Sequence, residues 1–226
     1  MNKPKQLTFP WIKQNIASFD DFYFDPENFG LKKNLLEEDD DLFLYGIKKS
    51  GKSFLLQSVC NFYDSKNKSS LYVPISDVKK YGISFMDSLD NLDVICIDDI
   101  DLINSNKEWE IAIFNLINDC LISKCRLIFS SSLNPSSIKF DLKDLISRIK
   151  KIDHVELFPV SEDKLNDALI FICNLRSINL GEKEINYLVT YSKRNISDLI
   201  NIINKLDKTS MQLKRKITIP LIKEVI

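Results

Sequence analysis

The sequence predicts an α/β fold in which helices flank a parallel sheet and a small all-helical unit follows it. Up to residue 158, short apolar runs alternate with segments of helical spacing, a pattern typical of parallel sheets covered on both faces. After Pro159 only helical spacing continues. Hydrophobic residues make up 44% and charged residues 28% of the chain, with only 5 glycines and 7 prolines. This composition fits a compact protein with a core and excludes disordered and collagen-like classes.

Five strands are expected in the first part of the chain. The run 93–97 is β-branched and apolar except at its ends, which indicates a strand buried on both faces of a sheet. The other apolar runs of strand length lie at residues 42–45, 71–75, 126–130 and 155–158.

Helices are expected between these strands. Trp109, Ile113 and Leu116 recur at helical spacing and predict a helix that continues to about residue 121. The same spacing predicts helices at residues 52–63, at 142–149, and at 78–89 with an interruption near Gly82.

The all-helical unit begins just after Pro159. Ser161 is expected to cap a helix that runs to about residue 175. Gly181 then separates this helix from two amphipathic segments at 182–192 and 196–211, and a last short helix is expected at 220–226. We therefore expect three parts: an N-terminal arm at 1–25 with two short aromatic clusters, an α/β base at 26–159 and a helical unit at 160–226.

Charge and cysteine usage limit the classes of function. The formal net charge is -1, so no global basic field marks the chain as a binder of nucleic acid or anionic membranes. The five cysteines form no C-x-x-C pair, which predicts reduced, buried thiols in a cytoplasmic protein. Neither a signal sequence nor a run of the ~18 apolar residues that a membrane helix needs is evident. The single histidine, His154, excludes a histidine-based triad and is expected to be structural.

Residues 46–53 read G-x-x-x-x-G-K-S, between a predicted strand and a predicted helix. Gly46 and Gly51 allow the backbone to curl so that successive N–H groups point toward phosphates, and the start of the helix adds the positive end of its dipole. Lys52 supplies a positive charge for the outer phosphates, and the hydroxyl of Ser53 can bind Mg²⁺. This segment predicts a phosphate-binding loop.

The buried strand that follows ends in two acids, Asp98 and Asp99. They are expected at the carboxyl edge of the sheet, where open α/β sheets bind ligands. Asp98 is expected to hold the metal through its water shell, and Asp99 to orient a hydrolytic water. Together with the loop at 46–53, the pair predicts binding of a nucleoside di- or triphosphate with Mg²⁺.

The two motifs resemble those of the AAA+ ATPases, and within them of the replication initiator DnaA and its relatives. Residues 18–22, with Asn28 shortly after them, are similar to the segment that packs beside the base and ribose. Residues 127–135 resemble the strand and turn of the first sensor, which aligns with Ser132. Residues 144–149 resemble the arginine-finger segment, with Arg148 as the finger. The helical unit resembles the AAA+ lid.

Two further segments are similar to the regulatory branch of this family, the inactivators of DnaA known as Hda. Residues 108–116 are very like the helix that follows the acidic strand in that branch. Residues 6–10 are similar to its clamp-binding pentapeptide, in which Gln6 can bond at a pocket rim while Leu7 and Phe9 insert as apolar anchors. An alternative is that the apolar residues of this arm pack on the protein's own surface. The chain is expected to end where DnaA begins its helix-turn-helix domain.

The sequence departs from the family pattern in the nucleotide-handling residues. Ser197 aligns with the second sensor arginine of the lid, and Arg194, one turn earlier, is the candidate to replace it. Ser132 is shorter than the acidic or amide residues more usual at the first sensor. Asp99 keeps an acid where some members of the branch carry an amide.

The resemblance implies a nucleotide-bound regulator of replication initiation, a weak ATPase alone, that binds the DNA-loaded sliding clamp and promotes ATP hydrolysis by DnaA, giving inactive DnaA-ADP. It implies ADP (or ATP) and Mg²⁺ as ligands, possible homodimers or higher oligomers, and neither sequence-specific DNA binding nor a membrane. A helicase-loader or initiator-like ATPase acting on single-stranded DNA is the alternative, disfavoured by the near-zero charge. A small-molecule P-loop kinase is a third reading, disfavoured by the arginine-finger segment and the helical lid.

Overall fold

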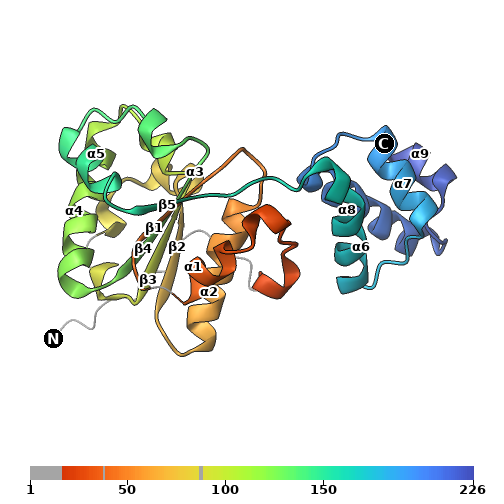
Figure 1. Ribbon diagram of the computed structural model, residues 1–226, viewed down its shortest axis with the longest axis horizontal. Helices are drawn as coiled ribbons and strands as arrows, with labels where there is room; N and C mark the ends of the chain where they lie inside the picture. Colours follow the sequence, from red (N-terminus) through yellow and green to blue (C-terminus); the bar gives the residue numbers. More distant parts are fainter. Residues whose placement is uncertain (1–16, 38, 87–88) are drawn as a thin grey trace.

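The computed structural model describes residues 17–37, 39–86 and 89–226. The expected clamp-binding residues Gln6, Leu7 and Phe9 lie outside these residues. Figure 1 shows a sheet with helices on both sides, and a separate helical unit joined to it by the chain that leaves the last strand.

The sheet has five strands, all parallel, in the order β2-β3-β4-β1-β5. The predicted parallel α/β sheet is therefore confirmed. The last strand begins and ends two residues earlier than the predicted 155–158. The strands are β1 (Leu42–Tyr45), β2 (Ser70–Pro74), β3 (Val94–Asp98), β4 (Arg126–Ser131) and β5 (Asp153–Glu156).

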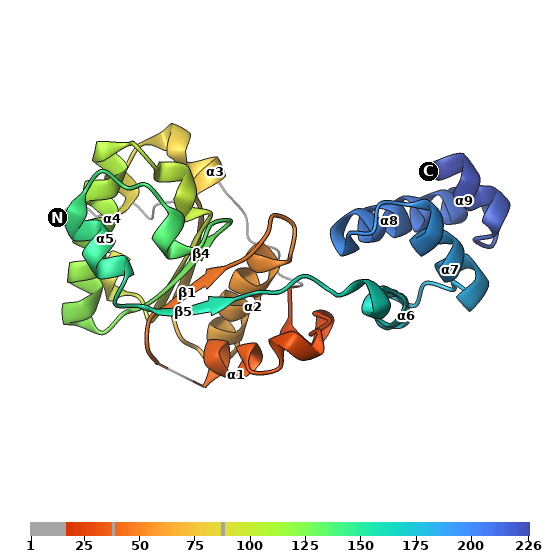
Figure 2. The same cartoon turned by 45° about the horizontal axis from the view of Figure 1, so that its top comes forward.

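Alternate residues of the strands face two separate cores. On β1, Leu42 and Leu44 pack toward α1 (Leu31–Leu36) and α2 (Lys52–Ser65). Phe43, between them, packs toward α4 (Lys107–Ser123) and α5 (Lys143–Ile149). Figure 2 shows these two helix layers on opposite sides of the sheet. The period of two in a parallel strand thus fills both cores.

The predicted helix at 78–89 is wrong. The described residues of this region, which leave out 87 and 88, form only α3 (Ile75–Val78) and the short 3-10 turns η3 (Lys79–Tyr81), η4 (Ser84–Met86) and η5 (Leu89–Asn91). Gly82 has a φ of +77°, outside the helical region, so the chain turns there instead of continuing a helix.

The helical unit has its own apolar core, to which α6, α7, α8 and α9 all contribute. Past Glu156, no strand occurs in the part of the chain that the structure describes. Ser161 occupies the N-cap position of the turn η8 (Glu162–Lys164), as predicted, but its side chain makes no capping bond, because its hydroxyl donates to Asp25. The helices are α6 (Leu165–Leu175), α7 (Glu182–Tyr191), α8 (Ile196–Leu213) and α9 (Ile219–Val225).

All five cysteines are buried and free, as the sequence predicts. His154 has a packing role: its Nε2 lies 2.9 Å from the carbonyl oxygen of Ile149, and its ring meets the Phe43 ring edge-on. Within residues 17–37, 39–86 and 89–226, no helix is both long and apolar enough to cross a membrane.

Candidate functional site

A cavity of about 550 Å³ lies at the carboxyl edge of the sheet. The loop 48–52 and the start of α2 form one wall, Asp99 and Asp101 after β3 and Ser132 after β4 form another, and the helical unit contributes Ser197. The cavity therefore brings together predicted site residues from four separate parts of the chain. Those that line it are Gly51, Lys52, Ser53, Asp99, Ser132 and Ser197.

The two glycines of the loop are required by close contacts. Gly51 has a φ of +107°, and a Cβ built on it would lie 2.6 Å from Cε2 of Phe22. A Cβ on Gly46 would collide with the backbone oxygen of Leu157. Gly51 lets the loop turn into α2 beneath an aromatic ring. Gly46 lets the chain that leaves β1 pass close to the segment after β5.

The ammonium of Lys52 lies inside the loop. Its Nζ donates to the carbonyl oxygens of Gly46 and Ile47, each at 2.8 Å, and the residue is only 5% exposed. Burial lowers the pKa of Lys52, although the carboxylates of Asp99, Asp98 and Asp101 oppose this shift. The loop thus concentrates a positive charge at the N-terminus of a 14-residue helix, which is an arrangement that binds anions.

The hydroxyl of Ser50 is a further donor in the same loop. Its Oγ is buried and has no hydrogen-bond partner among the described residues. A buried polar group without a partner is costly, so a ligand with acceptor oxygens fits this position. The loop therefore has the donors and the charge that a polyphosphate requires.

Asp98 lies behind the cavity wall and is held by two hydroxyl groups. Tyr72 donates to its Oδ2 at 2.7 Å, and Ser130 donates to its Oδ1. Ser130 Oγ also accepts the N–H of Asp99 at 2.9 Å. The carboxylate is 3% exposed and has a fixed orientation.

Asp99 faces the cavity in a left-handed backbone conformation, with φ 57° and ψ 49°. Burial raises the pKa of Asp99 to about 6, and the nearby Asp98 and Asp101 add to the shift, while Lys52 opposes it. Such a conformation is unusual for an aspartate and is concentrated at functional positions. Ser132 lies beside this cluster of aspartates, since its backbone N–H donates to Oδ1 of Asp101 at 3.1 Å.

Binding of Mg²⁺ at this site would require phosphate or water ligands in addition to protein side chains. Among the described residues, no group of three or more His, Cys, Asp or Glu side chains is placed to hold a metal ion. Mg²⁺ is usually bound by one or two side chains together with phosphate oxygens and water. The hydroxyl of Ser53 and the carboxylate of Asp98 fit that kind of binding.

The helical unit meets the loop through the start of α8. Ser197 Oγ donates to the carbonyl oxygen of Lys49 at 2.6 Å, and Nζ of Lys49 lies 2.6 Å from Oδ1 of Asp198. Asn195 caps α8 by accepting the N–H groups of Ser197 and Asp198. The position aligned with the second sensor thus contacts the loop through a short serine and an adjacent acid.

The two candidate arginines do not line the cavity. Arg194 donates to Oε2 of Glu162 at 2.7 Å on the surface of the helical unit. Arg148 lies half-buried on α5, on the face of the sheet opposite α2.

Two further contacts join the N-terminal part of the described chain to the connection between base and helical unit. Asp25, 2% exposed, accepts the N–H of Ser161 at 3.0 Å and its hydroxyl at 2.9 Å. Asn28 exchanges two hydrogen bonds with the backbone of Phe158, at 2.9 and 3.0 Å. Residues 17–25, predicted as part of an arm, therefore pack against the rest of the chain, and Phe19 is buried in the core beneath α2.

Sequence reasoning missed Tyr72, Ser130 and Asp25. Ser130 carried a signal, since it is a polar residue directly after the apolar run Leu127–Phe129 of a buried strand, close to the carboxyl edge of the sheet. Tyr72 and Asp25 carried none, because their partners lie 26 and 136 residues away in the sequence.

Two family descriptions match the chain. "Bacterial DnaA ATPase domain" matches residues 31–152, and "Hda, lid domain" matches residues 162–226. A relative from Haemophilus influenzae, an uncharacterized protein, is 30% identical over 228 residues, which is 98% of this chain and 98% of the relative.

Solved structures with the same fold include domain III of the replication initiation protein DnaA from Thermotoga maritima. Its TM-score is 0.79 at 19% identity, over 93% of this chain and 95% of that one. AMPPCP-bound DnaA from Aquifex aeolicus has a TM-score of 0.75 at 18% identity, over 86% of this chain and 66% of that one. The Holliday junction branch migration motor RuvB of Thermotoga maritima has a TM-score of 0.66 at 16% identity, over 93% and 71%.

Proposed function

The chain belongs to the DnaA-related AAA+ family of replication proteins, and from this premise we propose that it is a nucleotide-bound inactivator of DnaA. In this role it binds the sliding clamp on DNA and promotes hydrolysis of the ATP held by DnaA, which leaves DnaA in its ADP form. The observation that carries the proposal is the presence, in one chain, of a DnaA-type ATPase region and the lid of Hda.

The cavity supports the nucleotide part of the proposal. Lys52 and the N-terminus of α2 would hold the phosphates of ADP or ATP, and Ser53, with Asp98 behind the cavity wall, would hold Mg²⁺. The bound ion supplies charge that neutralises the phosphates. Asp99 faces the same cavity and orients water for a slow hydrolysis by the chain alone. The AMPPCP-bound DnaA of Aquifex aeolicus, which has the same fold, lends support.

The stimulation of DnaA is assigned to Arg148. Its place on α5, away from the residues that line its own cavity, suits a guanidinium that acts on a phosphate held by another molecule. A planar guanidinium can bridge phosphate oxygens and neutralise charge that develops in the transition state, an effect on the order of 10³–10⁵ in rate.

The attachment to the clamp is assigned to Gln6, Leu7 and Phe9, on the sequence alone. The division into an arm at 1–25, a base at 26–159 and a lid at 160–226 stays a prediction, although residues 17–25 of that arm pack on the rest of the chain. A cytoplasmic location and the formation of homodimers or higher oligomers also stay predictions. Binding of single-stranded DNA by an initiator-like ATPase remains the alternative function.

A turnover assay tests the proposal. DnaA loaded with ATP would be mixed with clamp-loaded DNA and the wild-type protein, and the ADP bound to DnaA would be measured with time. Arg148→Ala and Arg148→Lys should both lose stimulation, while Arg215→Ala, on the exposed lid, should keep it. Full stimulation by Arg148→Ala would remove Arg148 from the mechanism, and Arg194 would be the next residue to test. No stimulation by the wild type would overturn the proposed function.

A further inference from the structure

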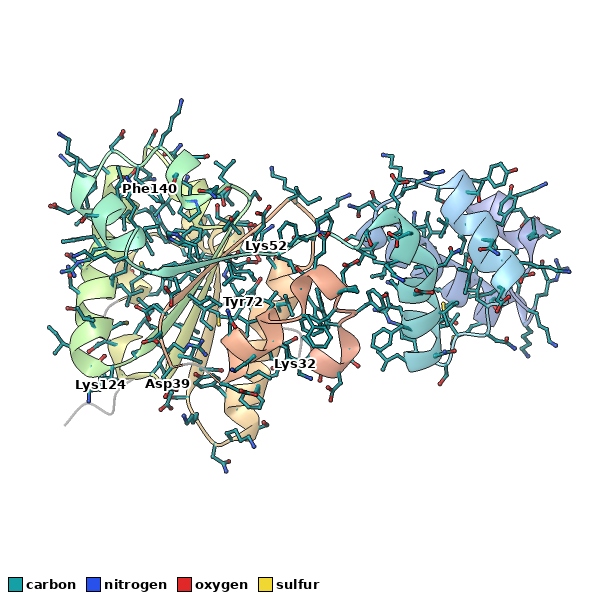
Figure 3. The ribbon with its side chains drawn as sticks, in the orientation of Figure 1. Lys32, Asp39, Lys52, Tyr72, Lys124 and Phe140 are labelled. Atoms are coloured by element: carbon teal, nitrogen blue, oxygen red, sulfur yellow. The ribbon has the colours of Figure 1, made fainter. Side chains whose placement is uncertain are left out.

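The hydroxyl of Tyr72 lies at the centre of a buried polar cluster behind the phosphate loop. It donates to Oδ2 of Asp98 at 2.7 Å. The side chains of Ser53 and Gln57, both on α2, lie near the same hydroxyl. Tyr72 is 7% exposed, so water does not replace these partners. Figure 3 shows Tyr72 and Lys52 together at the junction between the sheet and α2.

The strand register explains this placement. In the parallel pair β2–β3, Tyr72 lies opposite Cys96, and Pro74 opposite Asp98. The long tyrosine side chain therefore extends from two residues below the end of the strand up to the carboxylate at the sheet edge. Its ring belongs to the core beneath α2, which carries Ser53 and Gln57.

We propose that Tyr72 is a positioning residue for the magnesium–nucleotide site, because its hydroxyl aligns Ser53 of α2 with Asp98 of β3. This inference rests on the proposed binding of a nucleotide at the loop.

The directions of the hydrogen bonds give the reason. Because Tyr72 gives its proton to Asp98, its oxygen can accept the proton of the nearby Ser53 hydroxyl, whose lone pairs then stay free for a cation. Tyr72 passes its own proton to Asp98, which anchors the carboxylate and leaves its remaining lone pairs free for water bound to the cation. The same chain of bonds fixes the distance between α2 and the end of β3. Without the Tyr72 hydroxyl, the Ser53 hydroxyl loses an acceptor for its proton. Ser53 and Asp98 are then no longer connected through one side chain.

Tyr72→Phe separates positioning from packing, since it keeps the ring in the core and removes only the hydroxyl. Tyr63→Phe is the matched control: Tyr63 is 6% exposed in the same core, and its hydroxyl accepts from Nη1 of Arg126 at 3.4 Å, away from the loop.

The experiment measures ADP affinity by calorimetry for three proteins, wild type, Tyr72→Phe and Tyr63→Phe, each with Mg²⁺ and with EDTA. Wild type should bind ADP more tightly with Mg²⁺. Tyr72→Phe should lose about tenfold in affinity with Mg²⁺, as expected for a lost hydrogen bond to a charged group, and change little in EDTA. Tyr63→Phe should keep the full gain from Mg²⁺. Melting temperatures without nucleotide report any purely structural effect of either change.

Each outcome bears on the assignment. An unchanged gain from Mg²⁺ in Tyr72→Phe would overturn it, and so would an equal loss with Mg²⁺ and with EDTA, which indicates a structural role. If Tyr72→Phe does not fold, Gln57→Met removes another partner of the same hydroxyl and should lower the gain from Mg²⁺ several-fold; no change there would also overturn the assignment. Failure of the wild type to bind ADP at all would instead reject the proposed nucleotide site.

Discussion

Lys49 of the phosphate loop and Asp198 of the lid form an ion pair, with Nζ of Lys49 2.6 Å from Oδ1 of Asp198. The pair holds the pKa of Asp198 below its usual range, chiefly through the hydrogen bond from Lys49. It lies at the edge of the cavity, next to the bond between Ser197 and the Lys49 backbone. The lid therefore brings a negative charge close to the phosphate loop, where the family pattern has an arginine.

Removing that negative charge should tighten nucleotide binding. Asp198→Asn frees the Lys49 ammonium to interact with an anion in the cavity and removes a repelling carboxylate. Because the pair is partly exposed, its contribution is small, and the expected gain in ADP and ATP affinity is about two- to fivefold at low salt. Calorimetry at two salt concentrations would measure it. Asp207→Asn, farther along α8, is the matched control, and weaker binding by Asp198→Asn would show that the pair supports the site.

Lys52→Ala should weaken nucleotide binding strongly. The substitution removes the buried ammonium from the centre of the loop, and the loss of a charged partner for phosphate is expected to cost at least about tenfold in affinity. Titration of ADP and ATP by calorimetry would measure the change. Lys66→Ala, just past the other end of α2, should bind as the wild type does. Unchanged affinity in Lys52→Ala would rule out the loop at 46–53 as the phosphate site.

Replacing Gln6, Leu7 and Phe9 with alanine should abolish association with the sliding clamp and leave the melting temperature unchanged, since a terminal arm contributes little to the core. Surface-immobilised clamp would measure the binding, and calorimetric melting the stability. Lys3→Ala with Lys5→Ala alters the same arm and should keep both properties. A less stable triple variant that still binds the clamp would instead indicate that Leu7, Phe9 and Trp11 pack on the protein itself.

The contact between Asp25 and Ser161 should make stability depend on pH in the acid range. Burial raises the pKa of Asp25, but the hydrogen bonds from Ser161 and from the Glu27 N–H outweigh it and hold the pKa below its ordinary value. A lowered pKa in the folded state stabilises the protein above the unfolded value of about 3.9, and this contribution is lost as the pH falls through the folded value.

Asp25→Asn should therefore lower the melting temperature at pH 7 by about 2–4 °C, as expected for a loss on the order of 1 kcal/mol in a chain of this size. The difference from wild type should shrink toward zero below about pH 4, as the wild-type carboxyl takes up a proton. Melting curves at pH 7, 5 and 3.5 would test this, with Asp20→Asn on the surface as the control. A difference that stays constant across this range would mean that the charge of Asp25 does not contribute.

Local pattern predicted the features that depend on neighbours in the sequence. The strand at 42–45, the helix that starts at Lys52 and the acids at the end of β3 all lie where apolar runs and the glycine spacing place them. The helix expected at 78–89 does not form, because the chain turns at Gly82. The apolar residues of this segment are buried by short turns instead. Helical spacing cannot distinguish these two ways of burying the same residues.

Contacts between residues far apart in the chain could not be predicted from the sequence. Ser161 precedes a helical turn as expected, but its hydroxyl donates to Asp25, because folding brings a buried carboxylate to it from 136 residues away. The position of Ser197 was predicted from alignment alone, whereas its bond to Lys49 depends on how the lid meets the loop.

Hydrogen bonds from Asp25 and Asn28 attach residues 18–28 to the segment 158–161. Residues 158–161 lie in the segment that joins β5 to the helical unit, which Figure 2 shows. The ring of Phe22, in the same segment, lies next to Gly51 of the phosphate loop, where a Cβ would come within 2.6 Å of its Cε2. Residues 18–28 therefore form a direct bridge between the connection to the lid and the turn at which the phosphate loop enters α2.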